Sequence, residues 1–539
     1  MHIWLDPALY QQSGIFPHIF STGDRCVGEN SRYENFLDTS AYYANDCDDC
    51  SDCASPYQQC IVAPLPLQDR MLSLWNHRLW CSQNLYLAQL DATHWLACNP
   101  IDQGNIIVLD EEARSLLELF RSKHSLKELV KQWAGNPEYD LDQPSALQKA
   151  RIVTLFVTLG LIIDQDKKVD ILVLPSAPSK TLSAWLHVTN TCNMGCSYCY
   201  IAKSTEHMAT DIGERAVDAV IRSALHAHYQ QIHLKYAGGE ALLRLPQVLA
   251  LHDYALRQAE QHGLRLSATL LSNGAALLPR SIQQLKQRNI GVTISLDGIG
   301  EDHDKQRPLV NGMGSFRLVD RAITRLLEHD LMPNINVTVS QRNLAGLPKL
   351  VDYLLERDLP FSFSYYREND CSASLTDLQF SEKQMIHGMK AAFAIIERHL
   401  PARRIYSALI DKASFDAPHH HTCNVGESYL VIDQHGGVAK CQTEIAHTIT
   451  TIDADDPLQD IRRQREGIQV LDVDEKEGCR TCNWRYWCAG GCAAVTYRLT
   501  GRNDIRSPNC GIYKALFPEA LRLEALRLLQ YAPSLTFHS

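Results

Sequence analysis

The segment TLSAWLHVTNTCNMGCSYCY at residues 181–200 joins a strand-like apolar run to a loop with three closely spaced cysteines. The loop has the spacing Cys192-x3-Cys196-x2-Cys199, and Tyr198 lies directly before the last cysteine. Three thiolates on one loop suit a cubane iron–sulfur cluster, because they hold three irons and leave the fourth iron open for another ligand. Zinc is the alternative, but a zinc site usually takes four protein ligands, and no fourth ligand is adjacent.

The strand-like run is the first of six that alternate with helical patterns. The apolar runs cover residues 183–189, 232–236, 266–271, 291–296, 334–339 and 361–365. Between them lie segments such as ERAVDAVIRSALHAH, in which apolar residues recur at helical spacing. Strand–helix repeats predict a parallel sheet, because each crossover helix returns the chain to start another parallel strand. Six repeats are fewer than the eight of a closed barrel, so we expect an α/β fold with a partial (βα)6 barrel and a site at the carboxyl ends of its strands.

Short motifs follow the ends of these predicted strands. They are Gly238-Gly239-Glu240 after the second strand, Asn273-Gly274 after the third, and Ser295-Leu296-Asp297-Gly298 after the fourth, with HDKQR ending at Arg307. Glycines let the backbone approach a ligand closely, and a carboxylate can pair with an ammonium group. Each motif alone is compatible with an ordinary turn. Their joint placement at successive strand ends favours a ligand site.

Together with the cysteine loop, these motifs resemble the radical S-adenosylmethionine (SAM) superfamily along the whole repeated region. The resemblance implies that a 4Fe-4S cluster on Cys192, Cys196 and Cys199 chelates SAM and cleaves its sulfonium with one electron. The resulting 5'-deoxyadenosyl radical abstracts a hydrogen from the substrate. The resemblance also implies a set of SAM-binding residues: Tyr198, Gly238, Gly239, Glu240, Ser295, Asp297 and Arg307. Among these, Gly-Gly-Glu is expected at the methionine amine and the fourth-strand residues around the ribose and carboxylate.

The sequence holds 18 cysteines, and seven of them crowd into residues 423–510. They follow the spacing Cys423-x12-Gly436-x4-Cys441, then Cys479-x2-Cys482-x5-Cys488-x3-Cys492, then Cys510. The pattern resembles the SPASM extension of radical SAM enzymes. That resemblance implies one auxiliary 4Fe-4S cluster on Cys423, Cys441 and Cys492, and a second on Cys479, Cys482, Cys488 and Cys510. The fourth position of the first cluster is either open or filled by a group such as Glu427, and two zinc sites are the alternative to clusters.

Residues 84–174 combine two short strand patterns with three helical ones and a further strand at 170–173. Ser125 and Glu128 form a capping-box pattern at the second helix. This order predicts a winged-helix module, which resembles the leader-peptide-binding domain of enzymes that mature ribosomally synthesised and post-translationally modified peptides (RiPPs). The resemblance implies that a peptide adds a strand to its sheet edge. DNA binding is disfavoured, because the helix at 111–120 carries three acids and one arginine.

The N-terminal residues 1–60 hold nine acids and only two arginines. Within them lies Cys47-x2-Cys50-x2-Cys53-x6-Cys60, a spacing that suits zinc or a further iron–sulfur cluster; unpaired thiols in an acidic loop are the alternative. The isolated Cys81, Cys98 and Cys371 are expected to be small buried hydrophobes. For Cys371 the alternative is a thiol that donates a hydrogen atom to a substrate radical.

The length and composition of the chain exclude several classes of protein and of binding partner. The chain has 539 residues, 45% hydrophobic and 21% charged, which excludes a disordered or fibrous protein. A net charge of −10 gives no broad basic surface for nucleic acid or an anionic membrane. The longest apolar run, within residues 152–163, is too short for a bilayer, and no secretory signal is recognisable at the start, so we expect a cytoplasmic protein.

The expected organisation has seven parts. They are an acidic cysteine-rich segment (1–80), the winged-helix module (84–174), a linker (175–181), the radical SAM partial barrel (182–370), bridging helices (371–422), the SPASM domain (423–515) and a C-terminal helix (516–539).

These features predict a radical SAM oxidoreductase that modifies a ribosomally made precursor peptide, delivered by its leader. Side-chain cross-linking through carbon–carbon or thioether bonds is the first expectation, since a cross-link requires the loss of one more electron, which auxiliary clusters could accept. Peptide epimerisation and sulfatase-type maturation to formylglycine are the enzymatic alternatives. A peptide-binding protein with degenerate clusters is the non-enzymatic one. A low-potential donor such as ferredoxin or flavodoxin is the expected electron source, and neither nucleic acid nor membrane is an expected partner.

Overall fold

The computed structural model describes residues 1–6, 67–102, 104–134, 144–164 and 180–535. The chain forms two compact units. The first comprises residues 1–172, 401–404 and 524–539, and the second comprises residues 173–400 and 405–523. Within the described ranges, no helix combines the length and apolar character needed to cross a membrane.

The second unit is built on a nine-stranded sheet with the order β13-β12-β11-β10-β9-β8-β14-β15-β16. Its first six strands are all parallel to their neighbours, as the sequence predicts. They are β8 (Thr181–His187), β9 (Gln231–Ala237), β10 (Arg265–Ser272), β11 (Ile290–Ser295), β12 (Asn334–Val339) and β13 (Phe361–Tyr365). The predicted α/β fold with six strand–helix repeats is therefore confirmed.

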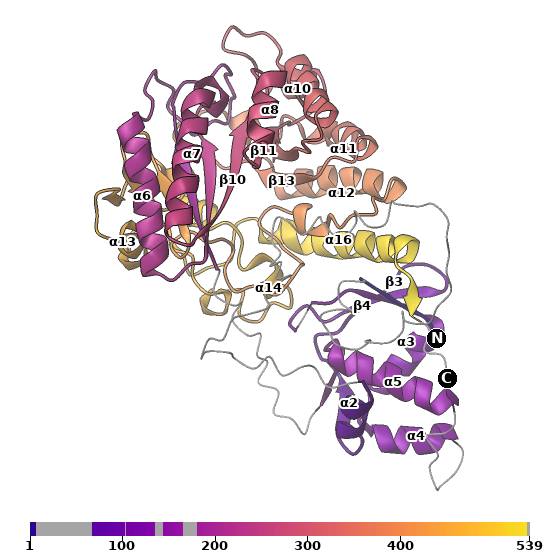
Figure 1. Cartoon of the computed structure of the whole chain (residues 1–539). Coiled ribbons are helices and arrows are strands. Elements are labelled where there is room, and N and C mark those ends of the chain that lie inside the picture. Colours follow the sequence, from indigo (N-terminus) through magenta and orange to yellow (C-terminus); the bar gives the residue numbers. More distant parts are fainter. Residues whose placement is uncertain (7–66, 103, 135–143, 165–179, 536–539) are drawn as a thin grey trace, which may run out of the picture. The chain divides into compact units, whose positions relative to one another are not determined.

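Helices lie along the outer face of this sheet (Figure 1). They are α6 (Thr210–His226), α7 (Leu245–Gln261), α8 (Pro279–Lys286), α10 (Phe316–Glu328), α11 (Leu347–Glu356) and α12 (Glu382–Arg398). The short α9 (Glu301–Asp304) follows β11 in the chain. Successive side chains of a strand point to opposite faces. On β11, Ile290, Val292 and Ile294 are fully buried, whereas Thr293 and Ser295 are only half-buried. The three buried side chains pack against the helices. Thr293 and Ser295 line the opposite, concave face of the sheet, where they can contact a ligand.

Three further strands extend the sheet beyond β8. The strand β14 (Tyr429–Ile432) pairs with β8 in parallel, and β15 (Gly437–Ala439) and β16 (Thr450–Thr451) follow in antiparallel pairing. The rest of this region contains α13 (Pro457–Arg463), α14 (Arg485–Cys488), α15 (Ala493–Thr500) and α16 (Cys510–Tyr531). The helix α16 begins at Cys510, six residues before the predicted start at 516, so Cys510 lies on its first turn.

The first unit contains two antiparallel sheets, with the strand orders β17-β1-β5-β4-β3 and β6-β2-β7. The strands are β1 (Ile3–Leu5), β2 (Arg78–Cys81), β3 (Tyr86–Gln89), β4 (His94–Cys98), β5 (Ile107–Asp110), β6 (His124–Ser125), β7 (Ile162–Asp164) and β17 (Ser534–Leu535). The helices are α2 (Leu67–Ser73), α3 (Glu111–Leu119), α4 (Leu126–Ala134) and α5 (Pro144–Thr158). The strand predicted at 170–173 lies outside the described residues.

Two local predictions in this unit are confirmed. The Ser125 amide donates to the Glu128 carboxylate (3.0 Å), and the Glu128 amide donates to the Ser125 hydroxyl (3.2 Å), which is the predicted capping box. Cys81 and Cys98 are buried, and burial raises the pKa of the Cys81 thiol to about 11. Both cysteines therefore act as small core residues in this unit.

Candidate functional site

The loop at residues 192–199, called the cysteine loop below, follows β8 and is held by the segment beyond β11. The Gly195 amide donates to the Pro308 carbonyl (2.7 Å), and the Ser197 amide donates to the Gln306 carbonyl (3.1 Å). These bonds fix the loop near the carboxyl end of the barrel strands, where a ligand site is expected.

The three thiols of the cysteine loop suit a cluster with one open iron. Cys192, Cys196 and Cys199 are each partly exposed and free of disulfides. Burial raises the pKa of Cys196 to about 11, and the charge of Arg307 opposes this shift. Three accessible sulfur donors on one short loop match the donor set for three irons of a cubane.

Gly238 and Gly239 let the end of β9 lie directly against the chain before the cysteine loop. The Gly239 amide donates to the Thr189 carbonyl (2.6 Å), and the Glu240 amide donates to the Thr191 carbonyl (2.9 Å). A Cβ on Gly239 would lie 2.5 Å from the Thr191 oxygen, closer than real Cβ contacts. Glycine is therefore required at position 239, because its backbone lies directly against the backbone of Thr191 and leaves no room for a side chain.

Replacing Gly239 with alanine is expected to displace the cysteine loop. Overpacking of this kind costs about 1–3 kcal/mol of unfolding free energy. We expect reduced iron content after anaerobic reconstitution, measured by iron analysis. Gly263→Ala is the matched control, because its Cβ would meet no atom within 4 Å, and it should keep its iron despite the strained φ of +67°. Full iron content in Gly239→Ala would contradict the packing argument.

Glu240 lies at the centre of the contacts between β9, β10 and the cysteine loop. Its carboxylate is 1% exposed and accepts hydrogen bonds from the Leu242 amide (3.0 Å), the Ser272 hydroxyl (2.8 Å) and the Asn273 amide (2.7 Å). Burial raises its pKa, and these hydrogen bonds oppose the shift. The Asn273 side-chain amide also lies 3.8 Å from the Cys192 sulfur. Asn273 thus connects Glu240 to the cysteine loop.

Three of the predicted SAM-binding residues, Tyr198, Asp297 and Arg307, are in direct contact. The Tyr198 hydroxyl donates to Asp297 Oδ2 (2.6 Å), and an Arg307 nitrogen lies 3.5 Å from the same oxygen and donates to the Tyr198 hydroxyl. The Thr338 amide donates to Asp297 Oδ1 (2.8 Å), and the Gln306 side chain donates to Oδ2 (3.1 Å). The Asp297 carboxylate is fully buried. Its two oxygens therefore join β11, β12 and the cysteine loop.

The structure adds residues that sequence reasoning did not assign to this site. Gln306 is fully buried, and its side chain also bonds the Thr338 carbonyl (2.9 Å); Asn343 donates to the carbonyls of Asp297 (2.7 Å) and Thr338 (2.8 Å). Gln306 belongs to the HDKQR motif, and its place beside Arg307 was the only hint in the sequence that it belongs to the site. Ser295 stands apart from this network, half-buried at the end of β11 and beside Asn336 in the sheet register.

Four of the C-terminal cysteines meet at one cavity in the second unit. Cys479, Cys482, Cys488 and Cys510 all line it, together with Trp484 and Phe517 among others. These are the four residues that the sequence assigns to one auxiliary cluster. Four sulfur donors around one enclosed space are a donor set that fits an iron–sulfur cluster or zinc.

Cys423, Cys441 and Cys492 form a second group next to buried cations. Cys441 is buried in a cluster of side chains that Cys423 packs against. An Arg367 nitrogen lies 3.3 Å from the Cys492 sulfur, and Arg367 also pairs with the buried Asp411 (2.8 Å). Burial alone would raise the pKa of Cys492, but the charges of Arg367 and Lys412 lower it. This environment favours a thiolate, the form that binds metal.

Glu427 was predicted as a possible fourth ligand of this group, but its side chain is engaged in another contact. Its carboxylate is 72% exposed and forms an ion pair with Arg462 (3.2 Å). An exposed, paired carboxylate is engaged at the surface, so Glu427 does not complete the group.

The expectation that Cys371 is a buried hydrophobe is wrong. Cys371 is exposed, and its thiol lies 3.7 Å from the Tyr200 carbonyl. Its amide bonds the Asn369 side chain (3.1 Å), which in turn donates to the Tyr198 carbonyl (3.1 Å). Cys371 therefore lies at the edge of the site, because it follows the carboxyl end of β13.

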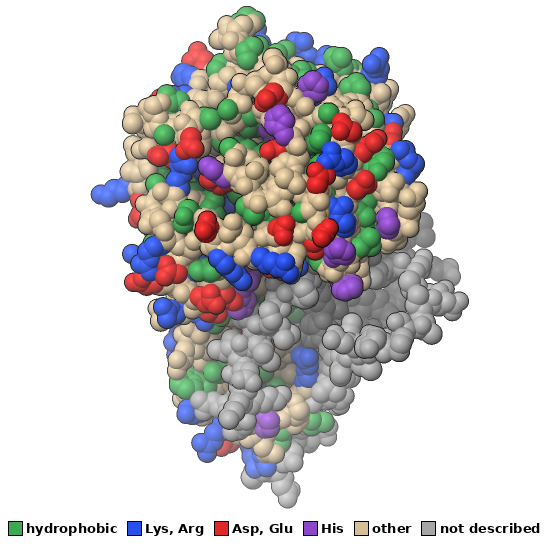
Figure 2. Space-filling view, turned by 90° about the vertical axis from the view of Figure 1, so that its left-hand side faces the viewer, with side chains coloured by type: hydrophobic (Ala, Val, Ile, Leu, Met, Phe, Trp, Pro, Cys, Tyr) green, Lys and Arg blue, Asp and Glu red, His purple; other side chains and the backbone are tan. Residues whose placement is uncertain are grey.

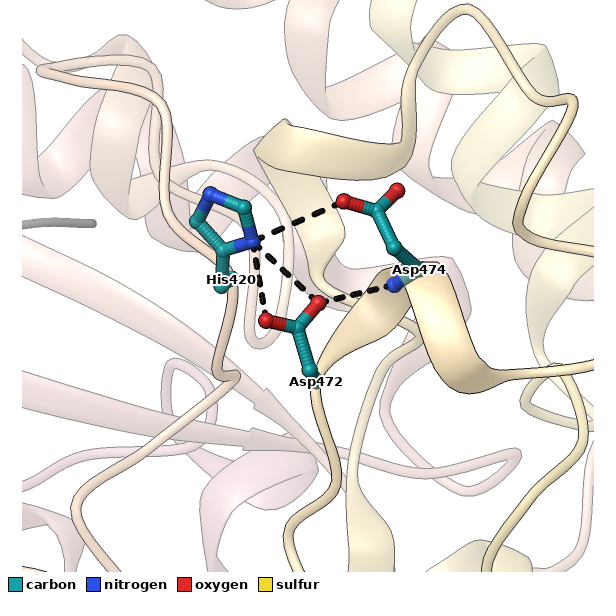
Figure 3. A group of neighbouring side chains, drawn as sticks. All are labelled: His420, Asp472 and Asp474. Atoms are coloured by element: carbon teal, nitrogen blue, oxygen red, sulfur yellow. Dashed lines mark hydrogen bonds and ion pairs between the residues drawn. The ribbon is translucent and has the colours of Figure 1, made fainter. Parts of the chain in front are cut away.

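A cluster of charged side chains, His420, Asp472 and Asp474, lies close in sequence to the C-terminal cysteines and was not predicted. His420 Nδ1 lies 3.1 Å from the Asp472 carboxylate and 3.7 Å from the Asp474 carboxylate (Figure 3). Asp474 also accepts from Arg485 (2.8 Å) and from the Tyr486 hydroxyl (2.9 Å). The group ties the chain before Cys423 to the chain before Cys479, so it positions both cysteine groups. The run of three histidines at 419–421 was the available signal.

The candidate N-terminal metal ligands Cys47, Cys50, Cys53 and Cys60 lie outside the described residues. On the face shown in Figure 2, basic and acidic side chains are intermixed, with no broad basic area among the described residues.

Comparisons with known proteins find relatives of this part of the chain. The sequence pattern of the radical SAM superfamily matches residues 186–350. A cysteine-type anaerobic sulfatase-maturating enzyme of Clostridium perfringens is 21% identical over 333 residues, which cover 56% of this chain and 85% of that protein. The antilisterial bacteriocin subtilosin biosynthesis protein AlbA of Bacillus subtilis is 23% identical over 272 residues, or 48% of this chain. The chain spans 54% of the length of AlbA.

Among solved structures, native anSMEcpe with bound AdoMet and Cp18Cys peptide is similar with a TM-score of 0.53 at 20% identity. The likeness covers 64% of this chain and 99% of that one, and it shows the shared fold. The strand repeat, the cysteine loop and the sequence match all cover the same stretch of chain. Residues 186–350 therefore form a radical SAM domain.

Proposed function

We propose that this enzyme modifies a ribosomally made peptide, with side-chain cross-linking as the reaction. The observation that carries the proposal is the arrangement of three separate thiol groups in one unit: the cysteine loop, the cavity cysteines and the Cys441 group. When bound, the cluster on the cysteine loop supplies one-electron cleavage of SAM. A cross-link removes two hydrogens from the substrate, so it also requires a site that accepts an electron. The additional thiol groups meet that requirement.

The protein's own residues would bind and orient SAM beside the cysteine loop. A carboxylate has about four acceptor positions, and three of those on Glu240 are occupied, which leaves one for the SAM ammonium group. Asp297 is fully buried and bonded to protein groups at both oxygens, so we assign it a positioning role for Tyr198 and Arg307. Ser295, half-buried on the concave face, is the fourth-strand residue free to contact SAM.

We assign an auxiliary cluster to each C-terminal cysteine group. Cys479, Cys482, Cys488 and Cys510 would hold one, and Cys423, Cys441 and Cys492 would hold the other. With the cluster on the cysteine loop, the wild-type enzyme should bind about twelve irons per chain after anaerobic reconstitution, since each of the three cubanes contains four.

Replacing both Cys479 and Cys510 with alanine should lower the iron content by about four per chain and leave the cluster on the cysteine loop intact. Iron analysis and electron paramagnetic resonance would measure this. Cys98→Ala is the matched control, because Cys98 is buried in the first unit and should not affect iron. An unchanged iron content in the double variant would contradict the assignment of an auxiliary cluster to Cys479 and Cys510.

The first unit supplies elements for peptide recognition. Three helices and the sheet β6-β2-β7 lie within residues 78–164, and among the described residues β3 is an edge strand of the larger sheet. An edge strand has unpaired backbone groups that can pair with an added strand. We propose that this unit is the winged-helix leader-binding module. The relation to AlbA, a bacteriocin biosynthesis protein, supports a peptide substrate.

Deleting residues 84–174 is expected to lower turnover of a full precursor peptide at least tenfold, an order of magnitude typical for the loss of a docking contact. SAM cleavage without peptide is the control that the second unit is intact. If precursor turnover stays at the wild-type level, the leader-binding assignment is wrong.

A second candidate is maturation of a sulfatase-type protein, which the relation to a sulfatase-maturating enzyme favours. Co-expression with any short peptides encoded beside the gene, followed by mass spectrometry, separates the two. Loss of two hydrogens from such a peptide supports cross-linking. An unchanged mass with a D-amino acid indicates epimerisation, and modification of a sulfatase alone would replace our proposal with the second candidate.

A further inference from the structure

A layer of side chains on the concave face of the sheet lies just before the carboxyl ends of β8 and β9. Lys235 on β9 is in register with Trp185 on β8 and with Thr269 on β10. The flanking Leu234 and Tyr236 are fully buried on the helix-covered face, so Lys235 points to the concave face. Trp185 comes seven residues before the first cysteine of the cysteine loop. The layer therefore belongs to the interior that a substrate would enter.

This layer holds hydrogen-bond donors without acceptors. Trp185 is 8% exposed, and its indole N–H has no hydrogen-bond partner among the described residues. In the part of the chain that the structure describes, the Lys235 ammonium has no carboxylate partner, and its recorded contact is the ring of Tyr429, 5.6 Å from the ring centroid. A buried polar group without a partner, such as the Trp185 N–H, is costly, and withdrawing the charge of the half-buried Lys235 from water adds to that cost. Both groups are donors, so the missing partner is an acceptor.

A second cation, Lys412, acts on Lys235. Lys412, which lies near enough to repel Lys235, has the thiols of Cys423 and Cys492 and the Asp411 carboxylate as favourable neighbours. For Lys235, burial lowers the pKa, and the charge of Lys412 lowers it further. An anion beside Lys235 would relieve both effects, so the binding partner expected here carries negative charge.

We propose that Lys235, together with the indole N–H of Trp185, binds a carboxylate of the peptide substrate inside the barrel. The enzyme would thus select peptides with Asp or Glu near the modified residue. The inference rests on the proposed function, because it takes the substrate to be a peptide. The N–H of Trp185 and the ammonium of Lys235 would hold the two carboxylate oxygens and fix the peptide beneath the cysteine loop.

The test compares two acetylated, amidated pentapeptides, Gly-Gly-Glu-Gly-Gly and Gly-Gly-Gln-Gly-Gly, which differ only in charge. Binding to the reconstituted enzyme is measured by equilibrium dialysis with saturating SAM. We expect wild type to bind the Glu peptide about tenfold more tightly, as for a charge-assisted hydrogen bond in place of a neutral one. Lys235→Met should abolish this preference, and Trp185→Phe should reduce it. Lys349→Met, at an exposed position on α11, should keep it.

Three results would overturn the proposal. One is the absence of a preference in wild type, whether both peptides bind or neither does. Another is a preference that persists in Lys235→Met. The third is a wild-type preference that exists without SAM and disappears with it, because the SAM carboxylate would then be the partner of Lys235. Failure to find any modified peptide in the cell would count against the proposed function and leave this comparison unaffected.

Discussion

Replacing Cys192, Cys196 and Cys199 together with alanine is expected to abolish the formation of 5'-deoxyadenosine from SAM. The three cysteines carry the only thiols of the cysteine loop, and a cluster without them cannot be held at this position. Dithionite-reduced enzyme, reconstituted without oxygen and sampled by liquid chromatography, gives the rate directly. We expect the rate to fall to the background of an enzyme-free reaction.

The iron content of this triple variant is the internal control. It should fall by about four per chain, while the irons assigned to the C-terminal cysteine groups remain. Removing all three thiols at once prevents partial ligation by the remaining ones. Continued SAM cleavage by the triple variant would show that the cysteine loop is not the site of the chemistry.

Replacing Asp297 with alanine is expected to destabilise the second unit by about 3–5 kcal/mol, because it leaves the buried Arg307 charge unpaired. The Tyr198 hydroxyl and the Thr338 amide would also lose their acceptor. Since Tyr198 belongs to the cysteine loop, we further expect SAM cleavage to fall roughly 10–100-fold, as for other groups that orient metal ligands. Chemical unfolding and the SAM cleavage assay measure the two effects.

Glu301→Ala is the matched control for Asp297→Ala. Glu301 also carries a carboxylate near a cation, Lys305 at 3.8 Å, but it is 90% exposed. Exposed ion pairs contribute about 0–1 kcal/mol, so this variant should retain near wild-type stability. Asp297→Asn keeps the size of the side chain and should fall between the two. An Asp297→Ala protein as stable as Glu301→Ala would refute the bridging role of Asp297.

The local features of the barrel could be read from the sequence with good accuracy. Strands buried on one or both faces appear as apolar runs, and all six predicted runs coincide with β8 to β13 within a few residues. The capping box of Ser125 and Glu128 was also predictable, because its partners are three residues apart.

Contacts between distant residues could not be read in this way. Tyr198 and Asp297 are 99 positions apart and meet only because β8 and β11 end at the same edge of the sheet. The same applies to β14, whose parallel pairing with β8 depends on the return of the chain after more than two hundred residues. Cys371 was misread because an isolated cysteine carries no pattern that separates a buried position from an exposed one.

The most direct test of the account asks whether the hydrogen abstracted by the enzyme comes from a peptide. The enzyme would be incubated with SAM, a reductant and a precursor peptide encoded beside its gene, made fully deuterated on carbon. Mass spectrometry of the 5'-deoxyadenosine should then show one deuterium, matched by a modified peptide. If the 5'-deoxyadenosine formed with the deuterated peptide contains no deuterium, peptide modification by this enzyme is contradicted.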